Sequence, residues 1–307
     1  MSAAGALGAS FLVVLAHPRW WVMSAAAFLV RGGLLLLLFP LIPLPTTAAL
    51  ANALGPTLIG FVFGGPSASF LALVGIVVGA TLAWFVGSGI AAAALDLALV
   101  QAAAEEEELE SRRRPAGVGV LRATAVRWLA HVPTAIALAW GAAALTDAAY
   151  TELIRPGDPT IPLVLRVIFR APVIVALVVV AWTLGEAVGG LAVRRLAWGT
   201  GTRRALAGAV VGLLRPAGLA VLLVTNLGLA AAVGGGAVAI GIAFDQARVL
   251  LLDGGTALET TMAVGLLSAT WIGTTVLVSI ATAWRSTAWT FEVARRQPDR
   301  TIDPAAA

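Results

Sequence analysis

Long apolar stretches constrain this 307-residue chain more than any other feature of its sequence. A helix needs about 20 apolar residues to cross the hydrocarbon core of a bilayer. Six stretches meet this requirement: 20–41, 68–95, 128–147, 172–193, 216–238 and 259–284. Only 12% of the residues are charged, whereas soluble domains carry roughly 25%. The sequence therefore excludes a soluble enzyme or a disordered chain, and it predicts an all-α integral membrane protein with six transmembrane helices.

The arginines between the stretches predict the orientation of the chain. All 20 basic residues are Arg, and basic residues concentrate on the cytoplasmic side of membrane proteins. If the N-terminus is cytoplasmic, 15 arginines lie in cytoplasmic segments and Arg31 lies inside the first span. The outer segments then hold Arg155, Arg166, Arg170 and Arg248. We expect both termini in the cytoplasm, and the Ala-, Gly- and Arg-rich composition without Lys favours a bacterial cytoplasmic (inner) membrane.

The net charge of +4 is spread over short connecting segments. We therefore interpret this positive charge as a signal that sets the topology, and not as a nucleic-acid-binding surface. Residues 1–16 carry no charged side chain, so they do not match a secretory signal, which begins with a positive region. Residues 3–16 are instead predicted to form a short helix in the membrane interface.

Short motifs at the starts of the odd-numbered spans indicate an internal repeat. Each is a half-apolar segment that ends in a basic residue and a proline: Leu15–Pro18, Leu129–Pro133 and Leu213–Pro216. Proline suits the first turn of a helix because the N–H there has no partner. Each motif thus predicts a short interfacial elbow helix before a span. We expect three hairpins in one membrane domain, with pseudo-repeats 1–114, 115–202 and 203–307.

The even-numbered spans support this repeat, because each holds a tryptophan close to a glycine, as in Trp182–Gly185. An elbow helix and a hairpin, repeated over six spans, resemble a set of uncharacterised six-span bacterial membrane proteins. The pattern is also similar to the membrane domain that accompanies some bacterial glycerophosphodiester phosphodiesterases. The motifs that carry the resemblance are His17-Pro18-Arg19 and Trp182 to Glu186. The resemblance implies a polytopic membrane domain without phosphodiesterase activity, because nothing in the sequence corresponds to the soluble catalytic domain.

Arg31 and Glu186 are the candidate ligand-binding residues. Arg31 lies about 16 Å along a helix from Trp20, a residue type that marks the membrane interface. The sequence therefore predicts Arg31 near the bilayer midplane, where a charged arginine costs roughly 2.5–3.5 kcal/mol. Such an arginine needs a partner or a water-filled cavity, and Glu186 is the expected partner. Gly32 and Gly33, which follow Arg31, permit close helix packing or a local break.

The sequence allows more than one interpretation of Arg31 and Glu186. Arg31 either binds an anionic group, forms a structural pair with Glu186, or reaches the interface through a helix break. Glu186 either completes the structural pair or takes part in proton coupling.

Arg166 and Arg170, four residues apart on a short outer helix, either bind lipid phosphate or extend their charged groups to the interface.

Other polar residues are expected to be structural. Asp96 is expected to be solvated where the second span meets the cytoplasm. His17 and His131 are expected to anchor the chain in the interface, and two His without any Cys do not indicate a metal site. The acidic run Glu105–Glu108 followed by Arg112–Arg114 predicts a helix that continues to residue 114, as a docking surface or a solvated helix end.

Two segments are expected to be irregular. Residues 40–66 contain five prolines and are too apolar for an ordinary loop. They predict a re-entrant hairpin, a segment on the outer leaflet, or a cover over a cavity. The glycine-rich stretch 234–241 predicts a broken end to the fifth span or a flexible outer loop, and discontinuous helices often mark transporter sites.

No catalytic constellation, nucleotide-binding motif or metal-ligand spacing is found in the sequence. We therefore expect no enzyme activity, cofactor or metal. The preferred hypothesis is an accessory or assembly subunit that packs in the lipid against a membrane-protein partner or a second copy. The alternative is a permease for a lipid or a small anionic solute, with Arg31 and Glu186 at its site.

Overall fold

The computed structural model describes residues 3–42, 48–49, 52, 64–65, 67–106, 119–155, 157–158, 161 and 163–295. Of these residues 92% are helical, and none of them lies in a strand. Six helices in the described ranges are long and apolar enough to cross a membrane: Pro18–Leu41, Ala68–Glu105, Val132–Glu152, Pro172–Ala197, Pro216–Leu252 and Ala257–Ala294. The predicted all-α fold with six candidate spans is confirmed at this level.

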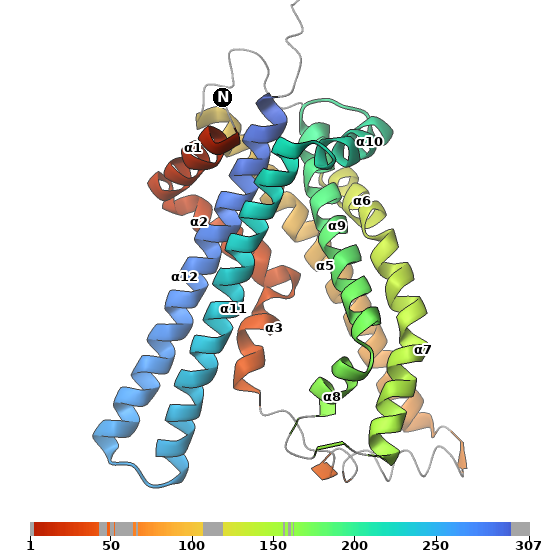
Figure 1. The fold of residues 1–307 in the computed structure, drawn as a ribbon, viewed down its shortest axis with the longest axis vertical. Coiled ribbons are helices and arrows are strands. Elements are labelled where there is room, and N and C mark those ends of the chain that lie inside the picture. The colour runs from red at the N-terminus through yellow and green to blue at the C-terminus, as the bar shows by residue number, and fades with distance from the viewer. Residues whose placement is uncertain are drawn as a thin grey trace, which may run out of the picture. The chain divides into compact units, whose positions relative to one another are not determined.

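The first span is broken into short pieces, whereas the later spans are continuous helices (Figure 1). The elements of the first part of the chain are α1 (Ala3–Ala16), α2 (Pro18–Phe28), the π-helical turn η1 (Leu29–Gly33), α3 (Leu34–Leu38) and the 3-10 turn η2 (Phe39–Leu41). They are followed by α5 (Ala68–Glu106), α6 (Val120–Ala130), α7 (Val132–Ile154), α8 (Leu163–Arg170), α9 (Pro172–Ala197), α10 (Thr202–Leu213), α11 (Pro216–Leu252) and α12 (Ala257–Arg295).

The chain forms two compact units. Unit 1 comprises residues 1–41, 89–130 and 186–307, and unit 2 comprises residues 42–88 and 131–185. The break between the units falls inside α5 and α9, so that each of these helices contributes one part to either unit.

The α11–α12 hairpin is the centre of unit 1. The two helices lie side by side (Figure 1) and are joined by a tight turn, in which Gly254 has a φ of 79°. A side chain at Gly236 of α11 would lie 2.1 Å from Cγ2 of Thr274 on α12. Only a glycine therefore lets the two helices approach so closely at this point.

α1 and α2 pack against the C-terminal part of α12. The Trp284 indole N–H donates a hydrogen bond to the Leu7 carbonyl over 3.1 Å. Phe11 meets the same indole edge-on, with ring centroids 5.5 Å apart. These contacts fix the short first helix on the long last one.

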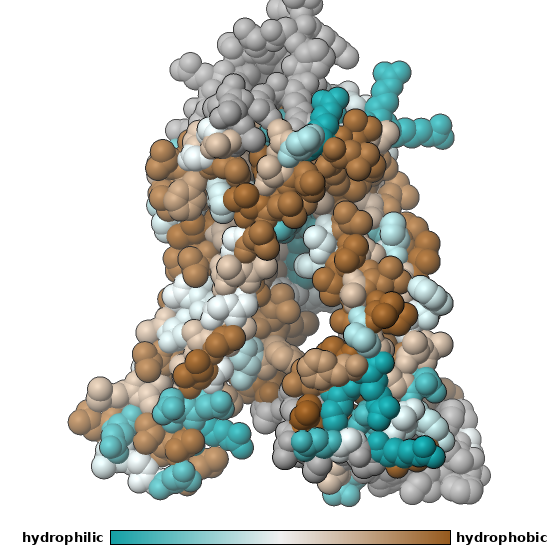
Figure 2. All heavy atoms as spheres, in the orientation of Figure 1, coloured by the Kyte–Doolittle hydropathy of each residue, from teal (hydrophilic) through white to brown (hydrophobic). Residues whose placement is uncertain are grey.

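Buried residues gather in one part of each long helix. Most buried residues of α12 lie from Val278 onward, those of α9 from Gly185 onward, and those of α5 from Ala92 onward. Residues 71–87 of α5 are all exposed. Most of the surface of the helices is apolar, and charged side chains gather at the turn of the α11–α12 hairpin (Figure 2). This is the pattern expected of helices whose apolar faces meet lipid or a partner.

Two sequence-based predictions about irregular segments have different outcomes. Residues 234–241 lie inside the continuous helix α11, so the predicted broken end or loop is wrong. The low helix propensity of glycine does not break the helix there, and at Gly236 close packing on Thr274 of α12 requires a glycine. Residues 43–47 and most of 50–66 lie outside the described residues, as do residues 107–118, so the re-entrant segment and the charged helix end stay predictions.

Replacing Gly236 tests the close approach of α11 and α12. Gly236→Ala should destabilise the protein by about 1–3 kcal/mol, because the added methyl group overpacks a well-filled contact. Thermal unfolding in mild detergent measures the effect. Gly235→Ala is the matched control, because open space surrounds Gly235 and alanine favours a helix. Equal stability of the two variants would contradict the packing described.

Candidate functional site

Six ionisable side chains from five elements of unit 1 meet in a polar network. The network consists of Arg31 in η1, Asp96 on α5, Arg127 on α6, Glu186 and Arg194 on α9, and Arg285 on α12. Asp96, Arg127 and Arg194 are buried, with relative exposures of 8%, 8% and 2%. The side chains of Glu186, Arg285 and Arg31 are 16%, 16% and 27% exposed.

Asp96 is the anion around which the buried half of the network is built. Its Oδ2 accepts a hydrogen bond from Arg127, and its Oδ1 accepts from Arg194 Nη2 at 3.3 Å and from the Ser286 hydroxyl at 3.2 Å. The expectation that Asp96 is solvated is therefore wrong. α5 continues past this residue to Glu106 and packs there against the rest of unit 1, which removes Asp96 from water.

Arg194 has all of its nitrogens directed at acceptors. Nη1 donates to the Gly190 carbonyl at 2.8 Å, and Nε donates to the Thr290 hydroxyl at 3.1 Å. Nη2 donates to the Ser286 carbonyl at 3.1 Å, in addition to Asp96. A charged group that is buried and fully hydrogen-bonded in this way joins α9 to α12 and α5.

Burial lowers the pKa of the Arg127 guanidinium, but the nearby carboxylates of Asp96 and Glu186 raise it by more. Its pKa therefore lies above the ordinary value for arginine, and the group remains a cation. α6 brings Arg127 close to α9, because Gly189 leaves room for the Arg127 backbone.

Glu186 is the anion of the more exposed half of the network. Its Oε2 accepts a hydrogen bond from Arg285 Nη2 at 3.1 Å and lies 3.7 Å from Arg31 Nη1 and 3.9 Å from Arg127 Nη1. We call Arg31, Arg127 and Arg285 the guanidinium triad. Arg285 also donates to the Asn226 side-chain oxygen at 3.2 Å.

Arg31 lies at a break in the first span. Gly32, the next residue, has a φ of 100°, a conformation that favours glycine. Gly33 follows within contact of the Phe28 ring. The break turns the backbone at Arg31, and among the described residues no acceptor lies within hydrogen-bond distance of its buried Nη2 atom.

The network carries more positive than negative charge. Four guanidinium groups face two carboxylates, and arginine keeps its charge in proteins. The formal charge of these six residues is therefore +2. An excess of cations with little access to water favours the binding of an anion.

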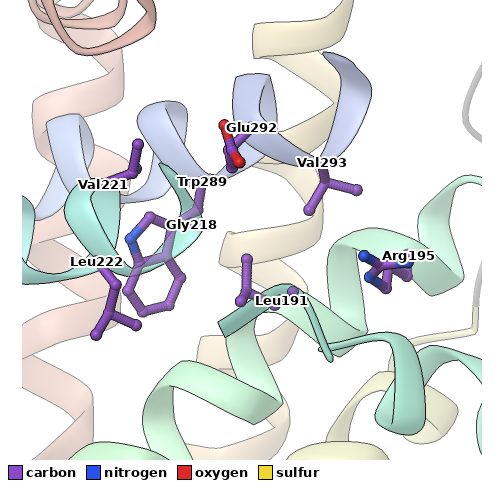
Figure 3. A pocket seen from close by; sticks show the side chains of 9 residues that line it. Leu191, Arg195, Gly218, Val221, Leu222, Trp289, Glu292 and Val293 are labelled. Carbon is purple, nitrogen blue, oxygen red and sulfur yellow. The ribbon is translucent and has the colours of Figure 1, made fainter. Parts of the chain in front are cut away.

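Trp289 lies between the network and a small pocket. Arg285 and Arg194 lie over its ring, at 4.7 Å and 5.7 Å from the centroid. The pocket measures about 20 Å³, is lined by Trp289, Leu222, Arg195 and Glu292 among others (Figure 3), and holds about one water molecule. It is too small for an organic ligand in this conformation.

The structure brings the two predicted ligand-binding residues together, since Arg31 and Glu186 form an ion pair. The sequence reasoning missed Asp96, Arg127, Arg194 and Arg285, because all four were assigned to the boundaries of the spans. One signal was available: Glu186 and Arg194 are eight residues apart, which places them on the same face of a helix.

Arg166 and Arg170 are placed together by a buried carboxylate of unit 2. Glu152 on α7 accepts from Arg170, and its Oε2 lies 3.3 Å from Arg166 Nε. Arg166 is buried and also donates to the carbonyls of Gly157 and Asp158, both at 3.0 Å. Its charged group is thus not extended to the surface. Lipid-headgroup binding by this pair stays a prediction.

His17 Nδ1 lies 2.8 Å from the Val13 carbonyl, and its ring stacks on Trp20 with centroids 4.6 Å apart. Among the described residues, no group of three or more His, Asp or Glu side chains has the geometry of a metal site.

No protein-family model, curated protein or solved structure matches this chain. Its function is therefore argued from the geometry of the network.

Removing the Asp96 carboxylate tests its structural role. Asp96→Asn should destabilise the protein by about 3–5 kcal/mol, because it removes the carboxylate partner of buried Arg194. Arg127 is then left with the more distant carboxylate of Glu186, at 3.9 Å. Thermal unfolding in mild detergent and size-exclusion chromatography measure the loss. Asp147→Asn is the control, because it removes the same charge from an exposed site on α7. A stable Asp96→Asn protein would contradict the role assigned to this residue.

Proposed function

We propose that this protein is a permease for an anionic solute or the anionic headgroup of a lipid, with the guanidinium triad as its anion site. One observation carries the proposal: the polar network has two more cations than anions, and its most exposed cation, Arg31, lies at a helix break with a buried nitrogen that lacks an acceptor within the described residues. Breaks of this kind line the binding sites of many transporters.

We also propose a position for the polar network in the membrane. Asp96 lies ten residues before the end of α5, Asn226 lies ten residues after the start of α11, and Arg285 lies ten residues before the end of α12. Ten residues correspond to about 15 Å along a helix. α6 follows the first of these helix ends, α10 precedes the second, and the C-terminal residues follow the third. The charge-free part of α12, residues 260–284, extends for about 37 Å on the other side. We therefore propose that the network lies at or near the level of the cytoplasmic headgroups. Arg31 is then closer to these headgroups than the midplane position that the sequence predicts for it.

The finer topology is part of the same proposal. α1, α6 and α10 are short helices, and each ends directly before a helix that begins at or next to a proline. This supports three interfacial elbow helices, each followed by a hairpin, with both termini in the cytoplasm of a bacterium.

Arg31→Gln tests the function directly. Arg31 makes one long ion-pair contact of 3.7 Å, so its loss should cost less than about 1 kcal/mol of stability. Binding of inorganic phosphate or short-chain phosphatidic acid should weaken by roughly tenfold or more, because a charged donor to the ligand is lost. Titration calorimetry measures binding, and thermal unfolding confirms folding.

Transport assays distinguish the two sources of the anion. Uptake of radiolabelled phosphate into proteoliposomes reports a solute permease, and movement of labelled phosphatidic acid between leaflets reports a lipid permease. Arg203→Gln is the control, because it removes one positive charge from an exposed position on α10. A folded Arg31→Gln protein that binds and transports like the wild type would refute the proposal.

An accessory role is the second candidate, and a different observation favours it. Residues 71–87 of α5 are apolar and exposed on every face, and Gly75, Gly79 and Gly87 have open space where a side chain would be. These glycines lie at intervals of four or eight residues, on one face of the helix. A small-residue face of this kind suits close packing against another transmembrane helix.

Gly79→Leu tests the accessory role. If α5 packs against a partner or a second copy, the added side chain should separate the helices and dissociate the complex, without loss of folding. Native mass spectrometry of the protein purified from its host in mild detergent measures the assembly. Gly265→Leu on α12 is the control, because Gly265 is also exposed and uncrowded. Wild-type protein that is monomeric throughout would exclude this candidate.

A further inference from the structure

Three cations converge on one oxygen of Glu186. Arg285 on α12, Arg31 in η1 and Arg127 on α6 lie 3.1 Å, 3.7 Å and 3.9 Å from Glu186 Oε2. Guanidinium groups arranged around a common point are a typical site for a phosphate or carboxylate oxygen. In this structure the oxygen at that point belongs to the protein itself.

The three cations lie at different distances from this one oxygen. Arg285 Nη2 donates a hydrogen bond to Oε2, whereas Arg31 Nη1 and Arg127 Nη1 lie 3.7 Å and 3.9 Å from it, beyond hydrogen-bond distance. The Nη2 atom of Arg31 is buried and has no acceptor among the described residues. A tetrahedral oxyanion carries more oxygens than a carboxylate and directs them toward different donors, so it suits three separate guanidiniums better.

The second anion of the network is not exchangeable in the same way. Both oxygens of Asp96 accept hydrogen bonds, from Arg127, Arg194 and Ser286, and the residue is more deeply buried than Glu186. Displacement of an anion by a ligand would therefore affect Glu186 first.

We propose that Glu186 is a resident counter-anion, which a phosphate or phosphomonoester group displaces from the guanidinium triad when it binds. The inference rests on the proposed function, since it concerns the ligand of the same site. When no ligand is present, the Glu186 carboxylate offsets the repulsion among the three arginines and holds α9 against η1, α6 and α12. When the ligand is present, its oxygens take over the contacts of Oε2, and Glu186 sets the affinity by competing for the same cations.

Binding measurements on Glu186→Gln test this inference. The full-length protein in mild detergent is titrated with inorganic phosphate and, separately, with short-chain phosphatidic acid. Glutamine keeps the size of the side chain but removes the competing charge, so binding should be roughly tenfold tighter than in the wild type. Glu259→Gln is the matched control: it changes the net charge equally, at an exposed residue of α12 that bonds to Thr256. Its affinity should stay within about twofold of the wild type.

The outcomes separate the inference from the function on which it rests. Tighter binding of both probes supports a shared phosphate site, and tighter binding of phosphatidic acid alone supports the inference with a lipid as the source. A wild type that binds, together with a folded Glu186→Gln protein that binds equally or more weakly, overturns the inference only. Failure of the wild type and both variants to bind either probe overturns the proposed function.

A second variant decides the matter if Glu186→Gln does not fold. Glu186→Asp keeps the negative charge but withdraws it from the triad by one methylene group. Binding of phosphate should then be tighter than in the wild type, because the shorter carboxylate competes less well. Unchanged or weaker binding by folded Glu186→Asp protein overturns the inference.

Discussion

The carboxylate of Asp96 is buried beside two guanidinium groups, and the packing of unit 1 depends on this arrangement. Removing an ion from water costs several kcal/mol in an apolar interior. Asp96 offsets that cost through Arg127, Arg194 and the Ser286 hydroxyl, which come from three different helices. A carboxylate with such partners specifies one arrangement of α5, α6, α9 and α12, since sliding any of these helices would leave a buried charge unpaired.

The other half of the network is built more loosely, and this contrast is the basis of the functional proposal. Arg194 directs all its nitrogens at nearby acceptors, whereas Arg31 makes one contact of 3.7 Å and lies beside a glycine with a φ of 100°. The break at Gly32 divides the first span into short helical pieces. Excess positive charge, partial exposure and a helix break thus occur at one residue. A purely structural ion pair requires none of these three features.

The sequence predicted the features that depend on composition and helix length. The six spans follow from apolar stretches, and Arg31 was singled out because a lone charge in a span needs a reason. Arg127, Arg194 and Arg285 were not recognised as site residues, because an arginine at the end of an apolar stretch looks the same whether it faces water or a buried carboxylate. Whether such a residue is buried depends on how far the neighbouring helices continue, which is a tertiary property.

The same cause explains the errors in the prediction of local structure. Glycines 234–236 lower helix propensity, yet they lie inside α11. Of the three, Gly236 is the one at which close packing on Thr274 of α12 requires a glycine. Asp96 was assigned to solvent because the apolar stretch before it ends there. The sequence predicted that the helix continues past Asp96, but not that the continuation is buried, as Leu99 and Ala103 are. In both cases the packing of one helix on another decided the outcome.

The most direct test of the account is a density map of the protein in nanodiscs, with a bound antibody fragment, in the presence and absence of phosphate. We predict density for an oxyanion in contact with Arg31 and Arg285 when phosphate is present, with the Glu186 side chain rotated away and Asp96 unmoved. A map in which Glu186 keeps its contacts with the guanidinium triad at saturating phosphate, and no density appears beside Arg31, would contradict the assignment of the triad as an anion site.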